Sequence, residues 1–277
     1  MREISLGFSP CPNDTFIFDA LIHQKIDHHY RFELFIEDVE TLNQMALDGK
    51  LDITKISTHA WFHVLDKYKL LTSGGALGRG CGPILLSKKS EIPSSGKIAL
   101  PGELTTAALL FKMAVGVNYE FVYMPFDQII PSILEGQVDA GVIIHESRFT
   151  FQKFDLINLI DLGEWWEKES GSLIPLGGII ISDRVTPDDQ IAIQDLIKQS
   201  VVFAENNPGS SSSFIKTYAQ EMEDGVIADH ISLYVNEFSK DLGQEGKAAI
   251  RLLYEKASDL TLLPDSSLGK KEKLFVS

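Results

Sequence analysis

His145 is the residue best placed for proton transfer, because it directly follows the apolar run Val138–Ile144. That run has the composition of a buried strand, and ligand sites of α/β sheets form where such strands end. An imidazole has an unperturbed pKa of about 6.5, so His145 can act as a general base at cellular pH. A structural histidine that is hydrogen-bonded within the core would show the same pattern. Glu146 could orient His145 or tune its pKa, although neighbouring residues of an extended chain point to opposite sides.

Three polar turns each join an expected strand to an expected helix. In the first, SPCPNDT at 9–15, two prolines fix the backbone, and Asn13 and Asp14 are good helix caps. Because the first N–H groups of a helix are free, three such turns converging on one cleft would bind an anion. Rigid turns with ordinary caps are the alternative. The other two are Thr54-Lys55-Ile56-Ser57 and Thr105-Thr106-Ala107, where a hydroxyl residue stands between the expected strand and the expected helix.

The loop Ser73–Gly82 contains five glycines and one cation, Arg79. A guanidinium at this place could hold a carboxylate with two hydrogen bonds, or it could be a solvated loop residue. The loop lacks the Lys-Ser/Thr ending of a phosphate-binding P-loop. Its glycine order also differs from the dinucleotide fingerprint G-x-G-x-x-G, so the loop does not favour nucleotide binding.

Metal and nucleophilic chemistry have weaker support. His59 and His63 have the spacing of H-E-x-x-H, but Ala60 replaces the glutamate and no third ligand is marked, so we expect no metal. A helix start lowers the pKa of a thiol, yet no histidine is tied to Cys11 by the sequence, so we do not expect a nucleophile there. Cys11 and Cys81 lack a C-x-x-C neighbour and are too few for a disulfide framework.

The composition is that of an acidic globular protein. The 277 residues are 44% hydrophobic, and 25 Lys and Arg against 39 Asp and Glu give a net charge of −14. Such a chain repels phosphate, which argues against nucleic acid and anionic membranes as partners. Met1–Gly7 does not resemble a signal peptide, and no apolar run approaches the roughly 18 residues of a membrane span. We therefore expect a cytoplasmic protein with a small-molecule ligand, and its oligomeric state stays open.

Short apolar runs alternate with helical patterns, which is typical of a parallel α/β sheet. The runs Pro83–Ser87 and Gly177–Ser182 match in length and character. They predict a first lobe of residues 1–88 and 177–277, with a helical tail, and a second lobe of residues 89–176. A cleft between two lobes is a common ligand site. Further strands are expected at 3–8, 30–36, 51–56, 97–100, 120–125, 138–144 and 156–162, and helices at 38–49, 105–115, 127–135, 187–206, 211–220, 224–235 and 245–256.

Four segments, in this order, resemble the 1,4-dihydroxy-6-naphthoate synthase family of the futalosine route to menaquinone. They are SPCPNDTF at 9–16, EDVETLN at 37–43, SGGALGRGCG at 73–82 and GVIIHESRFT at 141–150. The resemblance runs from about residue 5 to about residue 245. It implies a periplasmic-binding-protein-like fold of type II, in which two α/β lobes enclose a ligand cleft. It also implies a carbon–carbon lyase that converts cyclic dehypoxanthinyl futalosine to 1,4-dihydroxy-6-naphthoate.

The resemblance also implies roles for single residues. His145 matches the family's proposed base, which takes a proton so that the sugar-derived portion leaves and the second ring becomes aromatic. No metal or organic cofactor is implied. Asn43 enters through the resemblance alone, because the residue pattern reads it as an ordinary helix residue. The implied pocket comprises Asp14, Asn43, Lys55, Ile56, Ser57, Arg79, Thr105, Thr106, Ala107, Glu146 and Leu176, the last at the return crossing between lobes.

Two other functions fit the same lobes. A chorismate dehydratase of the same pathway also acts on a carboxylate-bearing ring, but the HES segment at 145–147 and the SPCPNDTF turn favour the naphthoate synthase. A non-catalytic binding protein for a small anion would use the same cleft without a base. A periplasmic receptor needs a signal peptide, so the version of this second alternative that remains is a cytoplasmic sensor.

Overall fold

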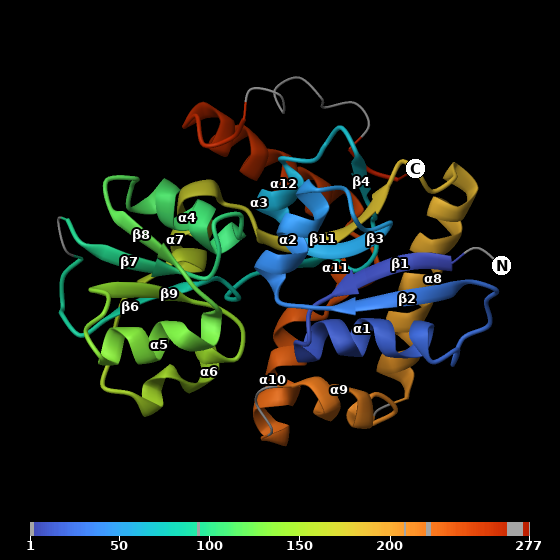
Figure 1. The fold of residues 1–277 in the computed structure, drawn as a ribbon, viewed down its shortest axis with the longest axis horizontal. Coiled ribbons are helices and arrows are strands. Elements are labelled where there is room, and N and C mark those ends of the chain that lie inside the picture. The colour runs from blue at the N-terminus through green and yellow to red at the C-terminus, as the bar shows by residue number, and fades with distance from the viewer. Residues whose placement is uncertain (1–2, 93–94, 208, 220–222, 265–273, 277) are drawn as a thin grey trace.

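The computed structural model describes residues 3–92, 95–207, 209–219, 223–264 and 274–276, and within them the chain forms two β-sheets, each flanked by helices (Figure 1). The first sheet is six-stranded, in the order β2-β1-β3-β11-β4 with β5 paired to β11. The second is five-stranded, in the order β10-β6-β9-β7-β8. The strands are β1 (Glu3–Phe8), β2 (Arg31–Ile36), β3 (Ile53–Ser57), β4 (Tyr68–Leu70), β5 (Ala76–Gly78), β6 (Ile84–Ser87), β7 (Lys97–Leu100), β8 (Glu120–Tyr123), β9 (Ala140–Ile143), β10 (Ile157–Asp161) and β11 (Ile174–Ser182).

Both sheets are mixed, whereas the sequence pattern predicts parallel ones. β1 pairs in parallel with β2 and β3, and β7 pairs in parallel with β8 and β9. In contrast, β11 is antiparallel to β3, and β6 is antiparallel to β9. β6 and β11 enter their sheets directly from the other lobe, without the helical crossover that parallel neighbours require. Periodicity identifies a strand but does not reveal its direction.

The two crossings between the sheets lie earlier in the chain than the sequence pattern places them. β6 begins at Ile84 and pairs within the second sheet, so residues 84–87 do not belong with the first lobe as the predicted segment 1–88 would have them. The return strand β11 begins at Ile174 rather than at residue 177. Both strands are buried apolar runs, and such a run carries no local signal of which sheet it joins.

The helices cover the outer faces and the tail returns to the first sheet. α1 contacts α8 and α10, and α12 contacts β11, whereas α4 packs against α7 in the second lobe (Figure 1). No helix in the described part of the chain is long and apolar enough to cross a membrane. The helices are α1 (Pro12–Ile22), α2 (Val39–Leu47), α3 (Thr58–Trp61), α4 (Thr106–Ala114), α5 (Phe126–Leu134), α6 (Ser147–Thr150), α7 (Leu162–Ser170), α8 (Pro187–Asn206), α9 (Ser212–Tyr218), α10 (Asp224–Tyr234), α11 (Glu237–Lys240) and α12 (Gly243–Asp259), with a 3-10 turn at Phe151–Lys153.

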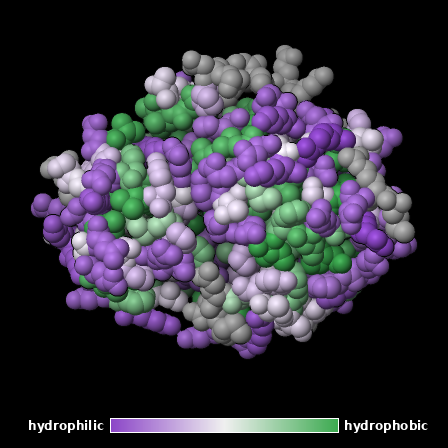
Figure 2. All heavy atoms as spheres, viewed as in Figure 1, coloured by the Kyte–Doolittle hydropathy of each residue, from purple (hydrophilic) through white to green (hydrophobic). Residues whose placement is uncertain are grey.

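One apolar cluster is continuous across the two lobes, because it contains buried side chains of both sheets, such as Leu85 of β6 and Ile180 of β11. Hydrophilic side chains cover much of the face in Figure 2, with separate apolar areas on each lobe. The lobes are therefore held together by shared core packing as well as by the crossing strands.

The helix starts show which sequence signals act as caps. Asp38 accepts hydrogen bonds from the backbone N–H groups of Glu40 and Thr41 at the start of α2, and Thr105 accepts one from Ala108 at the start of α4. α1 differs from the prediction, because it begins at Pro12, whose ring presets the helical φ angle. Asn13 and Asp14 thus lie inside the first turn and do not cap it, which leaves their side chains available for other contacts.

Candidate active site between the two lobes

A cavity of about 730 Å³, measured to its open mouth, lies between the lobes. Its walls are the turn after β1, the end of β3, the start of α4, the end of β9 and the C-terminal end of α10. Nine of the twelve residues predicted for the site line it, so the three polar turns and the histidine do converge. They are Asp14, Lys55, Ile56, Ser57, Thr105, Thr106, Ala107, His145 and Leu176.

Arg79 does not line this cavity. Its side chain is 52% exposed, and its guanidinium lies 3.9 Å from the carboxylates of Glu167 and Glu245. The neighbouring backbone is held in the same outward position, because the Gly80 N–H donates a hydrogen bond to Glu167. Arg79 is therefore a surface residue of the loop, and the prediction that it lies in the pocket is wrong.

Asn43 lies behind the cavity wall and supports it. Its Oδ1 accepts a hydrogen bond from the Ser57 backbone N–H at 3.0 Å, and its Nδ2 donates to Glu40 Oε2 at 3.0 Å. Glu40 in turn accepts a hydrogen bond from the Leu104 N–H, so this short chain of contacts joins the end of β3 to the loop before α4. Asn43 positions Ser57 and does not itself line the pocket.

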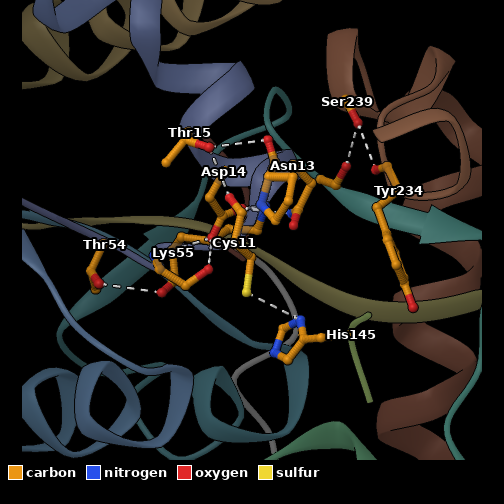
Figure 3. Close-up of polar contacts among 12 residues, drawn as sticks. Cys11, Asn13, Asp14, Thr15, Thr54, Lys55, His145, Tyr234 and Ser239 are labelled. Carbon is orange, nitrogen blue, oxygen red and sulfur yellow. Dashed lines mark hydrogen bonds and ion pairs between the residues drawn. The ribbon is translucent and has the colours of Figure 1, made fainter. Parts of the chain in front are cut away.

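A buried ion pair between Asp14 and Lys55 forms the floor of the site (Figure 3). Asp14 Oδ1 accepts hydrogen bonds from Lys55 Nζ at 3.0 Å and from Asn13 Nδ2 at 2.8 Å. Its Oδ2 accepts from the backbone N–H and the hydroxyl of Ser9. Both carboxylate oxygens accept hydrogen bonds, and these bonds offset much of the free-energy cost of removing the pair from water. The pair also neutralises the Lys55 charge, so anion binding here relies on backbone N–H groups.

His145 follows β9 and faces the cavity with partial exposure. Burial lowers its pKa, while the charges of Glu146 and Asp14 oppose that shift, so the imidazole is neutral at pH 7. Its φ angle is +55°, which is uncommon for a residue other than glycine. Such a backbone persists only where its surroundings hold it in place, and Phe126 packs edge-on against the ring at 4.8 Å.

Cys11 is the direct neighbour of His145, with its Sγ 3.4 Å from Nδ1 (Figure 3). Burial, followed by the charge of Glu146, raises the pKa of the thiol well above its usual value. Cys11 is thus protonated and a poor nucleophile, which agrees with the sequence-based expectation, but for a different reason: a histidine does lie beside it. Because Nδ1 contacts sulfur, Nε2 is the ring nitrogen without a partner among the described residues.

Glu146 is only 6% exposed and lies beside this pair without lining the cavity. One ligand atom each of Cys11, His145 and Glu146 lies within 4.8 Å of the others. Within the described residues, Glu146 Oε2 is buried and has no hydrogen-bond partner. Among the described residues no hydrogen bond joins Glu146 to His145, so of the two predicted influences, orienting and tuning, the structure shows the second: the negative charge of Glu146 raises the pKa of His145.

Two residues of α10 belong to the site, although the sequence pattern did not indicate them. Tyr234 lines the cavity, and its hydroxyl has no partner within the part of the chain that the structure describes (Figure 3). His230 lies one helical turn earlier, stacks on His145 at 6.2 Å and contacts Asn13 Oδ1 through Nε2 at 2.8 Å. Since Asn13 donates to Asp14 through its amide nitrogen, its oxygen must accept, so His230 Nε2 carries the proton. The sequence shows that His230 and Tyr234 are four positions apart, which places them on one face of a helix. It does not show that this helix packs beside the turn after β1.

His59 of α3 and His63, which follows that helix, lie close to the start of α4. His59 and His63 approach Nε2 to Nε2 at 3.3 Å, and His59 Nδ1 lies 3.2 Å from the carbonyl oxygen of Thr105. Burial, and then the charge of His63, lower the pKa of His59 to about 3. The neutral His59 ring therefore joins the first lobe to the start of α4.

Known proteins of one family match this chain along nearly its whole length. The sequence profile of a family described as menaquinone biosynthesis matches residues 4–259. The chain belongs to this family. Two curated relatives named 1,4-dihydroxy-6-naphtoate synthase are each 42% identical to it. The alignment with the relative from Thermus thermophilus covers 93% of this chain and 94% of the relative, and that with the Streptomyces coelicolor relative covers 94% and 95%.

Solved structures confirm the predicted fold of this member of the menaquinone-biosynthesis family. A protein from Archaeoglobus fulgidus superposes with a TM-score of 0.89 at 34% identity, covering 94% of this chain and 98% of that one. The periplasmic aliphatic sulphonate binding protein SsuA from Escherichia coli superposes with a TM-score of 0.67 at 10% identity, covering 99% of this chain and 92% of SsuA. The second likeness shows that the family uses the periplasmic-binding-protein fold.

Proposed function

We propose that this chain converts cyclic dehypoxanthinyl futalosine to 1,4-dihydroxy-6-naphthoate, with His145 as the general base. The observation that carries the proposal is a neutral imidazole that faces an interlobe cavity and whose Nε2 has no partner among the residues that the structure describes. The names of the two relatives at 42% identity support the reaction. Two buried free thiols are compatible with a reducing compartment, and we place the enzyme in the cytoplasm.

The reaction requires a general base, hydrogen-bond donors to the substrate oxygens that gain negative charge, and exclusion of water from the cavity. Nε2 of His145 removes a proton from the substrate, the sugar-derived portion leaves, and the second ring becomes aromatic. The gain in aromatic stability drives the reaction, so the protein needs only to lower the barrier. A positioned base typically contributes about 10²–10⁴-fold in rate.

Among the described residues that line the cavity, Lys55 is the one Lys or Arg and it is paired with Asp14, so the substrate's acidic groups are held by backbone N–H groups. Thr106 and Ala107, the first two residues of α4, line the cavity, whereas the Ser57 N–H already donates to Asn43 Oδ1. A helix start stabilises negative charge through its first N–H groups, even in a protein with a net charge of −14. Tyr234 adds a hydroxyl that can donate a hydrogen bond to a substrate oxygen as charge develops there.

Incubation of the purified protein with cyclic dehypoxanthinyl futalosine, with naphthoate followed by absorbance, tests the proposal. Chorismate serves as the parallel substrate, since a dehydratase of the same fold would act on it. Formation of dihydroxynaphthoate from the first substrate alone supports the assignment. Tight binding without turnover would show that the protein is a binding protein and not an enzyme. Turnover of chorismate would show that it is a chorismate dehydratase.

A further inference from the structure

Cys11, His145 and Glu146 form a cluster that the proposed reaction uses only in part. The reaction needs the Nε2 atom of His145, but it leaves the thiol of Cys11 and the carboxylate of Glu146 without a chemical task. Sγ, an imidazole nitrogen and a carboxylate oxygen lie within 4.8 Å of one another. Within the described residues, this is the one group of three or more His, Cys, Asp or Glu with that geometry.

The separations suit a tetrahedral zinc ion. Zn–S and Zn–N bonds of about 2.3 and 2.0 Å at a tetrahedral angle place sulfur and nitrogen about 3.5 Å apart. Cys11 Sγ and His145 Nδ1 are 3.4 Å apart, so these two need hardly move. The carboxylate oxygen of Glu146 needs to approach by roughly 1 Å, which a small side-chain rotation provides.

Glu146 supplies a second and independent indication of a cation. Its side chain is 94% buried, yet Oε2 has no hydrogen-bond partner in the described part of the chain. A buried oxygen without a partner is costly, and a cation would remove that cost. Lys55 is the nearby positive charge, but its ammonium is already compensated by Asp14 at 3.0 Å.

We propose that Cys11, His145 and Glu146 bind a thiophilic divalent metal such as zinc, and that the bound ion inhibits the enzyme. Coordination through Nδ1 leaves the single ring proton on Nε2, so the atom that must accept a proton from the substrate can no longer do so. Binding breaks the S–H bond of Cys11, forms a metal–sulfur bond and releases one proton to solvent. A thiolate, a neutral imidazole and a carboxylate then balance the charge of the ion. The inhibitory part of this inference rests on the proposed function, whereas the binding part does not.

Titration of the whole protein with Co²⁺ alone tests binding independently of turnover. Cobalt bound to a thiolate gives a strong charge-transfer absorption in the near ultraviolet, which a carboxylate or imidazole ligand does not produce. We expect this absorption in the wild type and in Cys81→Ser, which removes the other buried thiol. Cys11→Ser abolishes the band, and Glu146→Gln weakens binding of Zn²⁺, measured by competition with Co²⁺, at least about tenfold. Circular dichroism establishes that each variant is folded.

A band that persists in Cys11→Ser, or cobalt binding without any band in the wild type, would overturn the site. Zn²⁺ added to an assay of naphthoate formation is expected to inhibit the wild type, with recovery on adding a chelator. Inhibition of Cys11→Ser, relative to its own rate without metal, requires at least about 100-fold more Zn²⁺. If the protein forms no naphthoate, the proposed function fails, while the cobalt spectrum still decides whether the metal site exists.

Discussion

Sγ of Cys11 and Nδ1 of His145 lie 3.4 Å apart, and this contact joins the turn after β1 to the segment after β9. The two strands belong to different sheets, so His145 meets the polar turn of α1 only where the lobes meet. His230 extends the same arrangement, because it stacks on His145 and binds Asn13. Opening of the cleft would separate the proposed base from the Asp14–Lys55 floor, so catalysis depends on apposed lobes.

Replacing His145 by asparagine is expected to lower kcat by about 10²–10⁴-fold with little change in KM, because the base is lost while the cavity remains. Asparagine tolerates the positive φ angle at this position, so the backbone is preserved. Steady-state naphthoate formation measures the effect. His29→Gln, at an exposed histidine before β2, is the control and retains wild-type turnover. A near-normal kcat in His145→Asn would show that His145 is not the general base.

The acidic decline in the pH profile of kcat/KM is expected to lie below the ordinary histidine pKa. Only neutral His145 accepts a proton, and burial lowers its pKa, so the acidic decline begins below pH 6.5. The charge of Glu146 raises that pKa, so Glu146→Gln lowers it further and moves the decline to lower pH. Glu169→Gln, an exposed change on α7, leaves the profile in place. A shift of Glu146→Gln toward higher pH contradicts this electrostatic account.

Tyr234→Phe is expected to lower kcat/KM roughly 2- to 10-fold, the range of one hydrogen bond to a substrate oxygen. Its hydroxyl has no protein partner in the described structure, so thermal stability changes little. Tyr68→Phe is the matched control, because that hydroxyl donates to the Leu51 carbonyl within the core. The control loses stability and keeps its kinetic constants. The reverse pattern, with Tyr234→Phe destabilised and kinetically normal, would make Tyr234 a packing residue.

Lys55→Met is expected to destabilise the fold by about 3–5 kcal/mol, because it leaves the Asp14 carboxylate buried without its counter-charge. Adding Asp14→Asn recovers part of the loss, since the remaining group is then neutral. Denaturant unfolding of the single and double variants measures the coupling. Lys50→Met, which breaks an exposed pair with Asp48, changes stability little. Equal destabilisation of the single and double variants would show that the charge pair is not the cause.

Local patterns were sufficient for most of the elements. The bounds expected for the strand at 3–8 and the helix at 187–206 match β1 and α8, because strand alternation and helix caps are properties of neighbouring residues. The polar turns at Asp14, Lys55–Ser57 and Thr105–Ala107 were found in the same way. Since strands of one sheet end at a common edge, the approach of the first two segments to each other followed from the sequence as well, whereas Thr105–Ala107 reaches the cavity from β7 of the second sheet.

Tertiary structure alone decided the relationships between distant segments. Cys11 and His145 are 134 positions apart, and Tyr234 reaches the cavity from a tail that carries no motif. The antiparallel entry of β6 and the outward position of Arg79 likewise depend on which surfaces pack together. Hydrophobic burial selects those pairings by total area and shape, and neither quantity is encoded at a fixed spacing along the chain.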